Sequence, residues 1–172
     1  MDAFVRTVKW LSIASGFIAA ASLAVAVIVV CQMVILRYFL QESTIWQTEF
    51  VTYLIVGATF IGSPYVLLLK GHVNVDLLPL YLGHRGRMAL ALFSSVLSLI
   101  FCLLLAWTGF EYLLEAWQGG WRTDTVWAPP LWITIIPLPI GIGLLVLQYL
   151  ADILCLVTGR ELPFGLKAEE RP

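Results

Sequence analysis

Four long runs without Asp, Glu, Lys, Arg or His dominate this chain of 172 residues. A helix rises about 1.5 Å per residue and the hydrocarbon core of a bilayer is about 30 Å thick, so roughly 20 apolar residues are needed to cross it. The runs are 27, 20, 23 and 27 residues long and cover residues 10–36, 50–69, 88–110 and 125–151. The sequence therefore predicts an all-α integral membrane protein. We expect one domain over residues 1–172, with spans at about 11–36, 50–69, 88–112 and 130–151 and a tail at 159–172.

The composition excludes two classes of protein. Hydrophobic residues make up 60% of the chain and charged residues 12%, whereas a water-soluble domain carries about 25% charged residues. Lys plus Arg number 10 and Asp plus Glu number 11, so there is no basic excess to bind nucleic-acid phosphates. We expect neither a soluble enzyme domain nor a nucleic-acid partner.

The three cysteines, Cys31, Cys102 and Cys155, stand alone within apolar runs. None of them forms a CxxC pair, which argues against a redox relay, a zinc site or a disulfide framework. We expect them to be small buried hydrophobic residues.

The positive charges alternate between the two sides of the predicted bundle. Eight of the ten Lys and Arg residues precede the first span, join the second to the third, or follow the fourth. Because cytoplasmic loops are enriched in Lys and Arg, both termini are predicted to be cytoplasmic. Six of the seven Trp residues lie at or beyond the opposite boundary, as an aromatic belt requires. The first run is longer than a signal-peptide core of roughly 7 to 15 residues, so the first helix is expected to stay uncleaved.

The spans favour packing over conduction. Ion and proton pathways usually need ionisable groups or unwound backbone inside the membrane, and the four runs carry no Asp, Glu, Lys, Arg or His. Small residues recur at four-residue spacing, which lets helix backbones approach closely, either within the chain or between subunits. They are Gly16, Ala20 and Ala24, then Ala58 and Gly62, then Ser94 and Ser98.

Prolines mark the fourth span. Pro129 and Pro130 stand at its start, where a first helical turn tolerates them, whereas Pro137 and Pro139 fall inside it. Interior prolines remove backbone donors, so we expect a kinked or late-starting helix.

The first connection contains a helix-start pattern. Thr44 followed by Gln47 reads as a capping box, which opens a helix through Trp46 and Phe50 at the membrane interface. Glu49 is then either a solvated carboxylate favoured by the helix dipole or a partner for a positive group on another subunit.

The second connection alternates polar and apolar residues after Gly71. His72 and Asp76 would meet across one helical turn, but one His and one Asp supply too few ligands for a metal site. Asp76 is expected to cap a short interfacial helix, so that His72 and Asp76 shape this loop. Residues 84–87, with His84, Arg85 and Arg87, are expected to contact lipid headgroups.

The third helix is expected to run past Phe110 until Gly119 and Gly120 stop it. Glu111 and Glu115 share a face of this extension, and neither has a neighbour that would complete a catalytic set. The acidic, Trp-rich end is either a solvated collar or a docking surface for an external protein. The candidate docking residues are Glu111, Glu115, Trp117 and Trp121.

Four sets of motifs occur in order along the chain. They are Trp46 with Glu49, Phe60-Ile61-Gly62, Gly71-His72-Val73 with Val75-Asp76-Leu77, and Pro130-Leu131-Trp132 with Ile136-Pro137 and Gly141. Together with the four spans, these motifs resemble the small membrane subunit of tripartite ATP-independent periplasmic (TRAP) transporters, the DctQ family. The resemblance covers most of the chain. Two departures are Lys70, where an arginine is more usual, and Gln47-Thr48, which precede Glu49 without a second acid.

The resemblance implies a non-catalytic scaffold in a bacterial inner membrane. Its partners would be a large multi-span subunit, which carries the substrate and sodium sites, a periplasmic substrate-binding protein and the lipid bilayer. No cofactor, metal or catalytic residue is expected in this chain. The candidate subunit contacts are the motif residues Trp46, Glu49, Gly62, Gly71, His72, Asp76, Trp132, Pro137 and Gly141.

Three alternatives stay open at this point. A small subunit of a tripartite tricarboxylate transporter would have the same architecture and a different partner. A small membrane enzyme of the quinone-linked thiol oxidoreductase or lipid-modifying kind needs paired cysteines or a polar cluster, which the sequence lacks. A free-standing homo-oligomeric channel or scaffold would need no large partner.

Overall fold

The computed structural model describes residues 2–69 and 84–158, and this part of the chain is helical. Four of its helical segments are long and apolar enough to cross a membrane, which confirms the all-α class predicted from the uncharged runs. Within the described ranges the only β-type pairing is an isolated bridge between Arg122 and Pro130. The elements are α1 (Asp2–Ile35), the π-helix η1 (Leu36–Leu40), α2 (Ile45–Leu68), α4 (His84–Gln118), α5 (Leu131–Ile135) and α6 (Pro137–Val157).

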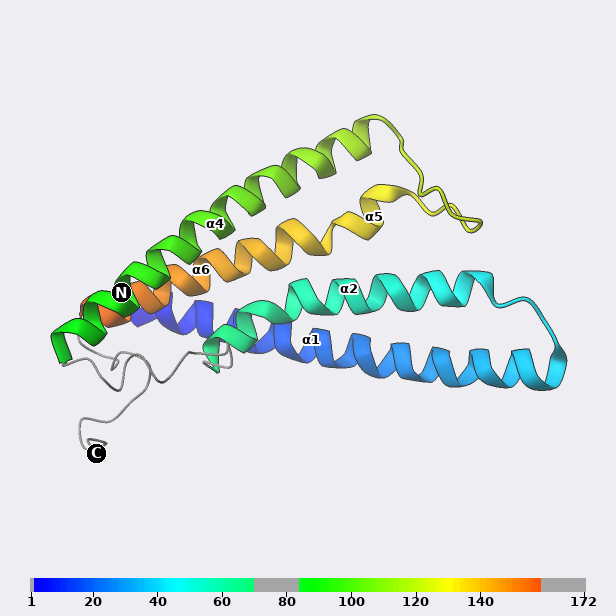
Figure 1. Ribbon diagram of the computed structural model, residues 1–172, viewed down its shortest axis with the longest axis horizontal. Coiled ribbons are helices and arrows are strands. Elements are labelled where there is room, and N and C mark those ends of the chain that lie inside the picture. Colours follow the sequence, from blue (N-terminus) through cyan, green and yellow to red (C-terminus); the bar gives the residue numbers. More distant parts are fainter. Residues whose placement is uncertain (1, 70–83, 159–172) are drawn as a thin grey trace.

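The helices form two antiparallel hairpins that diverge from a common end (Figure 1). In one hairpin α1 packs against α2, and in the other α4 packs against α6. Helix α6 joins the hairpins because it also contacts α2 and α1. The end where the hairpins separate carries residues 36–50 and 112–132, and we call it the Trp-rich end.

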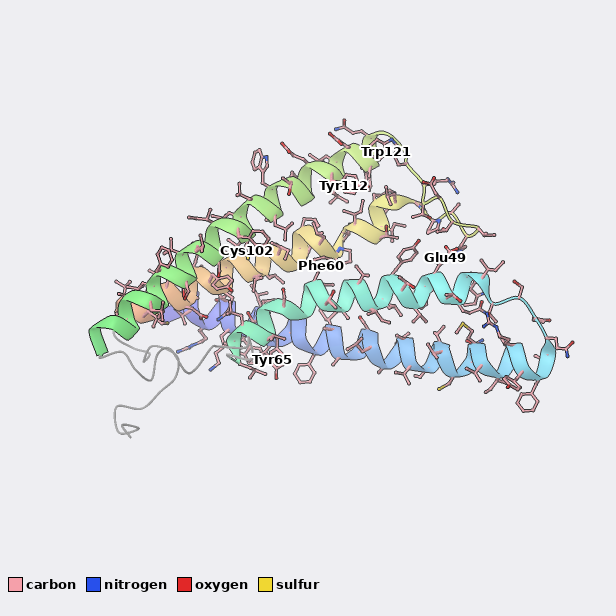
Figure 2. All side chains as sticks on the ribbon, viewed as in Figure 1. Glu49, Phe60, Tyr65, Cys102, Tyr112 and Trp121 are labelled. Carbon is pink, nitrogen blue, oxygen red and sulfur yellow. The ribbon has the colours of Figure 1, made fainter. Side chains whose placement is uncertain are left out.

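The core lies where α6 meets α4 and α2. Cys102, Ile142, Leu145 and Val146 are buried there, with Phe60 of α2 packed against them (Figure 2). Most other large apolar side chains point away from the bundle, and Phe17 and Phe101 are 75% and 65% exposed. Lipid is as apolar as these side chains, so a membrane bundle gains little by hiding them.

The cysteine prediction is confirmed for Cys102 and Cys155, which are buried, and is wrong for Cys31, which is exposed. Cys31 lies on α1 near the edge of the α1–α2 seam, beside Val27 and Ile55. Because lipid also accepts apolar side chains, an apolar run does not by itself fix which of its residues face protein.

The helices extend further than the expected spans. The 35 residues of α4 make a helix about 52 Å long at about 1.5 Å per residue, well beyond a hydrocarbon core of about 30 Å. The expected stop at Gly119-Gly120 is confirmed. The backbone N–H of Gly119 donates to the carbonyl of Glu115 (2.8 Å), and Gly120 adopts a φ of +59°, a conformation that glycine takes without strain.

The fourth span is broken, as its prolines predict. A turn at Ile136 separates α5 from α6, and Pro137 is the first residue of α6. The expectation that Pro137 and Pro139 remove interior donors is wrong. Both lie in the first turn of α6, where backbone N–H groups have no intrahelical partner.

The capping box at the start of α2 does not form. Thr44 is the N-cap residue, yet its side chain makes no capping bond, and its Oγ1 accepts instead from Nη2 of Arg37 at 3.3 Å. Gln47 is buried at 3% exposure, and its Oε1 has no hydrogen-bond partner among the described residues. The pattern therefore predicts the boundary of the helix correctly and its hydrogen bonds wrongly. Thr44 has φ −113° and ψ 39°, outside the β-region conformation that is typical of a residue whose side chain caps a helix.

Candidate functional site

A carboxylate joins the two hairpins at the Trp-rich end. Glu49 lies one turn into α2, on the side that faces residues 121–130, and we call that segment the strap (Figure 2). Oγ1 of Thr125 donates to Oε2 of Glu49 at 2.7 Å, and the backbone N–H of Trp127 donates to Oε1 at 3.4 Å. Both carboxylate oxygens are thus engaged by the strap, so Glu49 is a tie between elements 76 residues apart.

Three aromatic rings surround this tie. The ring of Trp127 lies 6.4 Å from that of Trp46 and 6.5 Å from that of Phe50, centroid to centroid. The rings of Trp46 and Phe50 are themselves 6.4 Å apart. Such tilted and edge-on pairs contribute about 0.5–1.5 kcal/mol each beyond the area that they bury.

The strap holds its own shape through backbone hydrogen bonds. The N–H of Leu131 donates to the carbonyl of Trp121 at 2.9 Å, and the N–H of Thr123 donates to that of Pro129 at 3.1 Å. Ala128 has a positive φ of 46°, which is uncommon for a residue with a side chain. The segment is therefore a folded turn that presents Thr125 and Trp127 to α2.

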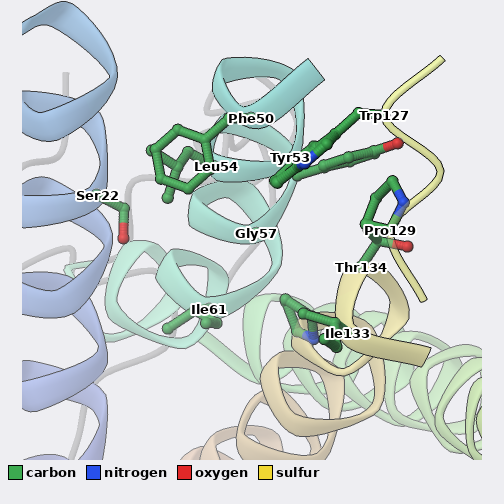
Figure 3. Close-up of a pocket in the computed structure, with 11 residues that line it drawn as sticks. Ser22, Phe50, Tyr53, Leu54, Gly57, Ile61, Trp127, Pro129, Ile133 and Thr134 are labelled. Atoms are coloured by element: carbon green, nitrogen blue, oxygen red, sulfur yellow. The ribbon is translucent and has the colours of Figure 1, made fainter. Parts of the chain in front are cut away.

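A cavity of about 260 Å³ lies beneath the strap, between the hairpins (Figure 3). It opens where the break at Ile136 turns α5 away from the axis of α6, and where Gly57 gives α2 no side chain to fill the gap. Its walls come from α1, α2, the strap, α5 and the first residue of α6. They are formed by Ser22, Phe50, Tyr53, Leu54, Gly57, Ile61, Trp127, Pro129, Ile133, Thr134 and Pro137.

Below the cavity, the backbones of α2 and α6 approach closely at Phe60 and Gly141. A Cβ on Gly141 would overlap the carbonyl oxygen of Phe60, so only glycine fits there. Pro64 lies inside α2 and has no N–H to donate to that carbonyl, and Oγ of Ser63 donates to it instead at 2.8 Å. The crossing therefore unites two motifs that the sequence analysis singled out separately, around Phe60 and around Gly141.

The other singled-out residues also pack within the chain. A Cβ on Gly57 would lie 3.4 Å from Pro137, and one on Gly62 would lie 3.1 Å from Cβ of Ala19. The rings of Trp117 and Trp132 are 4.6 Å apart, which joins the end of α4 to α5. These contacts are compatible with further contacts to a partner, which stay a prediction.

The four docking candidates lie in the last turns of α4 and at the start of the strap. Glu111, Glu115 and Trp117 are exposed on α4, and Trp121 begins the strap (Figure 2). The ring of Trp121 contacts that of Tyr112 at 6.3 Å. Gly71, His72 and Asp76 lie outside the described residues, as do the expected interfacial helix and the tail at 159–172.

Sequence reasoning missed a buried polar connection between α1 and α6. Oγ of Ser12 donates to Oε1 of Gln148 at 2.8 Å, and Nε2 of Gln148 donates to Oδ1 of Asp152 at 2.8 Å. Ser12 and Gln148 are 1% and 3% exposed. The sequence feature that could have predicted this connection is Gln148 itself, because an amide inside an apolar span needs a hydrogen-bond partner when water is excluded.

Among residues 2–69 and 84–158, no group of three or more His, Cys, Asp or Glu side chains gathers in a way that could hold a metal ion. The Glu49–Thr125 and Ser12–Gln148 hydrogen bonds join helices or segments far apart in the chain. These hydrogen bonds hold the two hairpins together and leave an apolar cavity between them.

Comparison with known proteins gave one family. The model described as "Tripartite ATP-independent periplasmic transporters, DctQ component" matches residues 26–159, which is well over half of the chain. A search of curated proteins returned no match.

Proposed function

The chain belongs to the DctQ family of tripartite ATP-independent periplasmic transporter components, and from that membership we propose that it is the scaffold subunit of a sodium-coupled importer. Membership makes it the small membrane subunit of such a transporter and decides between the two importer families that the sequence left open. What we propose is its role. The chain would be a static, non-catalytic partner of the large subunit, and the large subunit would carry out transport and sodium coupling.

The observation that carries this role is how the polar groups within the spans are used. Ser12 and Gln148 use their hydrogen bonds to join α1 to α6, and the four runs contain no Asp, Glu, Lys, Arg or His of the kind that moves ions. A subunit built in this way braces its neighbours and leaves ion coupling to a partner.

We propose that the large subunit covers exposed faces of α1 and α4. Helix α6 contacts all three other spans and is the most enclosed of them, so little of its surface is free for a partner. Phe17 on α1 and Phe101 on α4 point outward and are largely exposed. The broken fourth span would then lie at the centre of the bundle and contact the other spans, and α1 and α4 would contact the large subunit.

The Trp-rich end is proposed to face the periplasm, with both termini in the cytoplasm. The excess of Lys and Arg near the opposite end of the spans supports this orientation. Glu111, Glu115 and Trp117 would then be available to the substrate-binding protein, because they are exposed in the part of α4 that follows its uncharged run.

The role is tested by purifying the tagged chain from its native membrane in mild detergent and identifying bound proteins by mass spectrometry. We expect a large multi-span protein at near-stoichiometric yield. Recovery of the chain alone, or only with copies of itself, would contradict the scaffold role.

Transport in proteoliposomes completes the test. The large subunit with this chain and the binding protein is expected to take up substrate with a sodium gradient, and the large subunit without this chain is expected to fail. Uptake that is equally fast without this chain would show that the scaffold is dispensable.

A further inference from the structure

We propose that the cavity beneath the strap binds one acyl chain of a membrane phospholipid, from the leaflet at the Trp-rich end. The proposal is independent of the transported substrate and of the sodium coupling. It concerns a lipid held between the two hairpins of this chain.

The residues that line the cavity on α2 are spread over the depth of about one leaflet. On α2 its lining runs from Phe50 to Ile61, which is eleven residue steps, or about 16 Å at about 1.5 Å per residue. Half of a hydrocarbon core of about 30 Å is about 15 Å. The cavity starts at the aromatic residues Phe50 and Trp127, which are of the kind that marks the membrane boundary, and it ends near Ile61.

The chemistry of the walls suits hydrocarbon better than water. The hydroxyl of Ser22 donates to the carbonyl of Ile18 at 2.9 Å, and that of Thr134 donates to the carbonyl of Leu131 at 2.7 Å. The backbone N–H of Trp127 is taken by Glu49 at 3.4 Å. With these donors used within the chain, the hydroxyl of Tyr53 and the indole N–H of Trp127 are the remaining side-chain donors among the lining residues. Ordered water would therefore find few partners in the cavity, and walls this poor in polar groups favour hydrocarbon.

The cavity also connects with the surface that lipid covers. Ile133 and Trp127 line it and are 50% and 43% exposed, so it reaches the outside of the bundle at their position. That outside is the surface of four segments long and apolar enough to span a bilayer. Bilayer lipid is therefore the apolar molecule present at the highest concentration beside the opening.

The volume excludes a larger occupant. About 260 Å³ spread along that length leaves a narrow slot, whereas a helix with its side chains is about 10–12 Å across. Part of one extended hydrocarbon chain fits this volume, and it would supply van der Waals contacts that the lining side chains otherwise lack.

The proposal is tested on the purified complex of this chain with its partner subunits in lipid nanodiscs. The nanodiscs contain a phosphatidylethanolamine with a photoreactive diazirine on one acyl chain, and the adducts are mapped by mass spectrometry after irradiation. We expect adducts concentrated at Ile61 and Ile133, above the level on exposed apolar residues such as Phe17 and Phe101.

Two pairs of variants separate filling of the cavity from general disturbance. Ser22→Phe and Ile133→Trp place bulk at two opposite walls, and Ala21→Phe and Ile140→Trp make similar changes at exposed positions that do not line the cavity. We expect labelling at Ile61 to fall about tenfold in the first pair, equivalent to about 1.4 kcal/mol of lost affinity, and to be unchanged in the second. Using two walls keeps the test valid if one variant fails to fold.

Two results would overturn the proposal. One is labelling spread evenly over the exposed spans, with no preference for the cavity. The other comes from a photoreactive amino acid placed at Ile133: crosslinks to the large subunit, in place of lipid, would mean that a partner side chain occupies the slot.

Discussion

The carboxylate of Glu49 accepts a hydrogen bond of 2.7 Å from Oγ1 of Thr125, a residue 76 positions further along the chain. The bond links the first turns of α2 to the strap that leads from α4 into α5. It holds together two hairpins that meet closely at their other end and separate toward the Trp-rich end (Figure 1).

Replacing Glu49 by Gln is expected to loosen the strap. Hydrogen bonds to a charged group contribute about 1.5–3 kcal/mol, and partial exposure places this tie toward the low end. Amide hydrogen exchange of residues 121–130 should rise while exchange within the α2–α6 crossing stays unchanged. Thr125→Val should have a similar effect, and the two changes together should be less than additive. Glu111→Gln, at an exposed carboxylate on α4, is the control. If it raised the amide exchange of residues 121–130 as much as Glu49→Gln does, Glu49 would not be holding the strap.

Replacing Gly141 by Ala is expected to force α2 and α6 apart. The added Cβ would overlap the Phe60 carbonyl, which is backbone and cannot rotate away. Overpacking of this kind costs about 1–3 kcal/mol, so thermal unfolding in detergent should occur at a lower temperature. Gly143→Ala is the matched control, because no atom of the described residues lies within 4 Å of a Cβ built there. Equal effects of the two substitutions would contradict the close crossing.

Replacing Ser12 by Ala is expected to destabilise the contact between α1 and α6. The change leaves Oε1 of Gln148 buried without its donor. Interhelical hydrogen bonds in membrane proteins average about 0.6 kcal/mol, with values up to about 1.7. Gln148→Leu should cost more, because it also removes the bond to Asp152.

Unfolding in mixed micelles of increasing SDS content measures the loss of stability in Ser12→Ala and in Gln148→Leu. Ala14→Ser is the control, because it makes the reverse change at an exposed position two residues along the same helix. If Ser12→Ala unfolds at the same SDS content as the unmodified chain, the hydrogen bond to Gln148 does not hold α1 against α6.

Reversing the charges of Glu111 and Glu115 to Lys is expected to weaken the action of the binding protein without affecting assembly. Both carboxylates are exposed, so their contribution is mainly to the rate of encounter and depends on salt. Half-maximal uptake in proteoliposomes should need roughly tenfold more binding protein, and the difference should shrink as salt is raised. Glu42→Lys, on the other hairpin of the same end, is the control. Unchanged uptake in the double variant would assign these residues to a solvated collar.

The helices and their breaks could be predicted because their causes are local. Uncharged runs of sufficient length produce spans, Gly119-Gly120 stops α4, and the prolines of the fourth span break it. Each of these effects acts over a few residues of backbone, so the sequence alone suffices to locate them.

The contacts of the site could not be predicted in the same way. The sequence offered two interpretations of Glu49, which stay predictions, and the structure adds hydrogen bonds with Thr125 and Trp127 that neither interpretation named. The hydroxyl of Thr44 accepts from Arg37 of η1 and makes no capping bond, and Cys31 is exposed although its run is apolar. In each case the deciding neighbour comes from another element of the fold or from lipid.

The sequence by itself determined that this is a membrane protein of four helices with a broken fourth span, because hydropathy and backbone chemistry act locally. Only the tertiary structure decided that the motifs around Phe60 and Gly141 form one crossing, and that Glu49 closes the strap over a cavity. The physical reason is that an apolar face is equally satisfied by lipid and by protein. Partner choice among the helices therefore depends on close backbone approach and on a few hydrogen bonds between residues far apart in the chain.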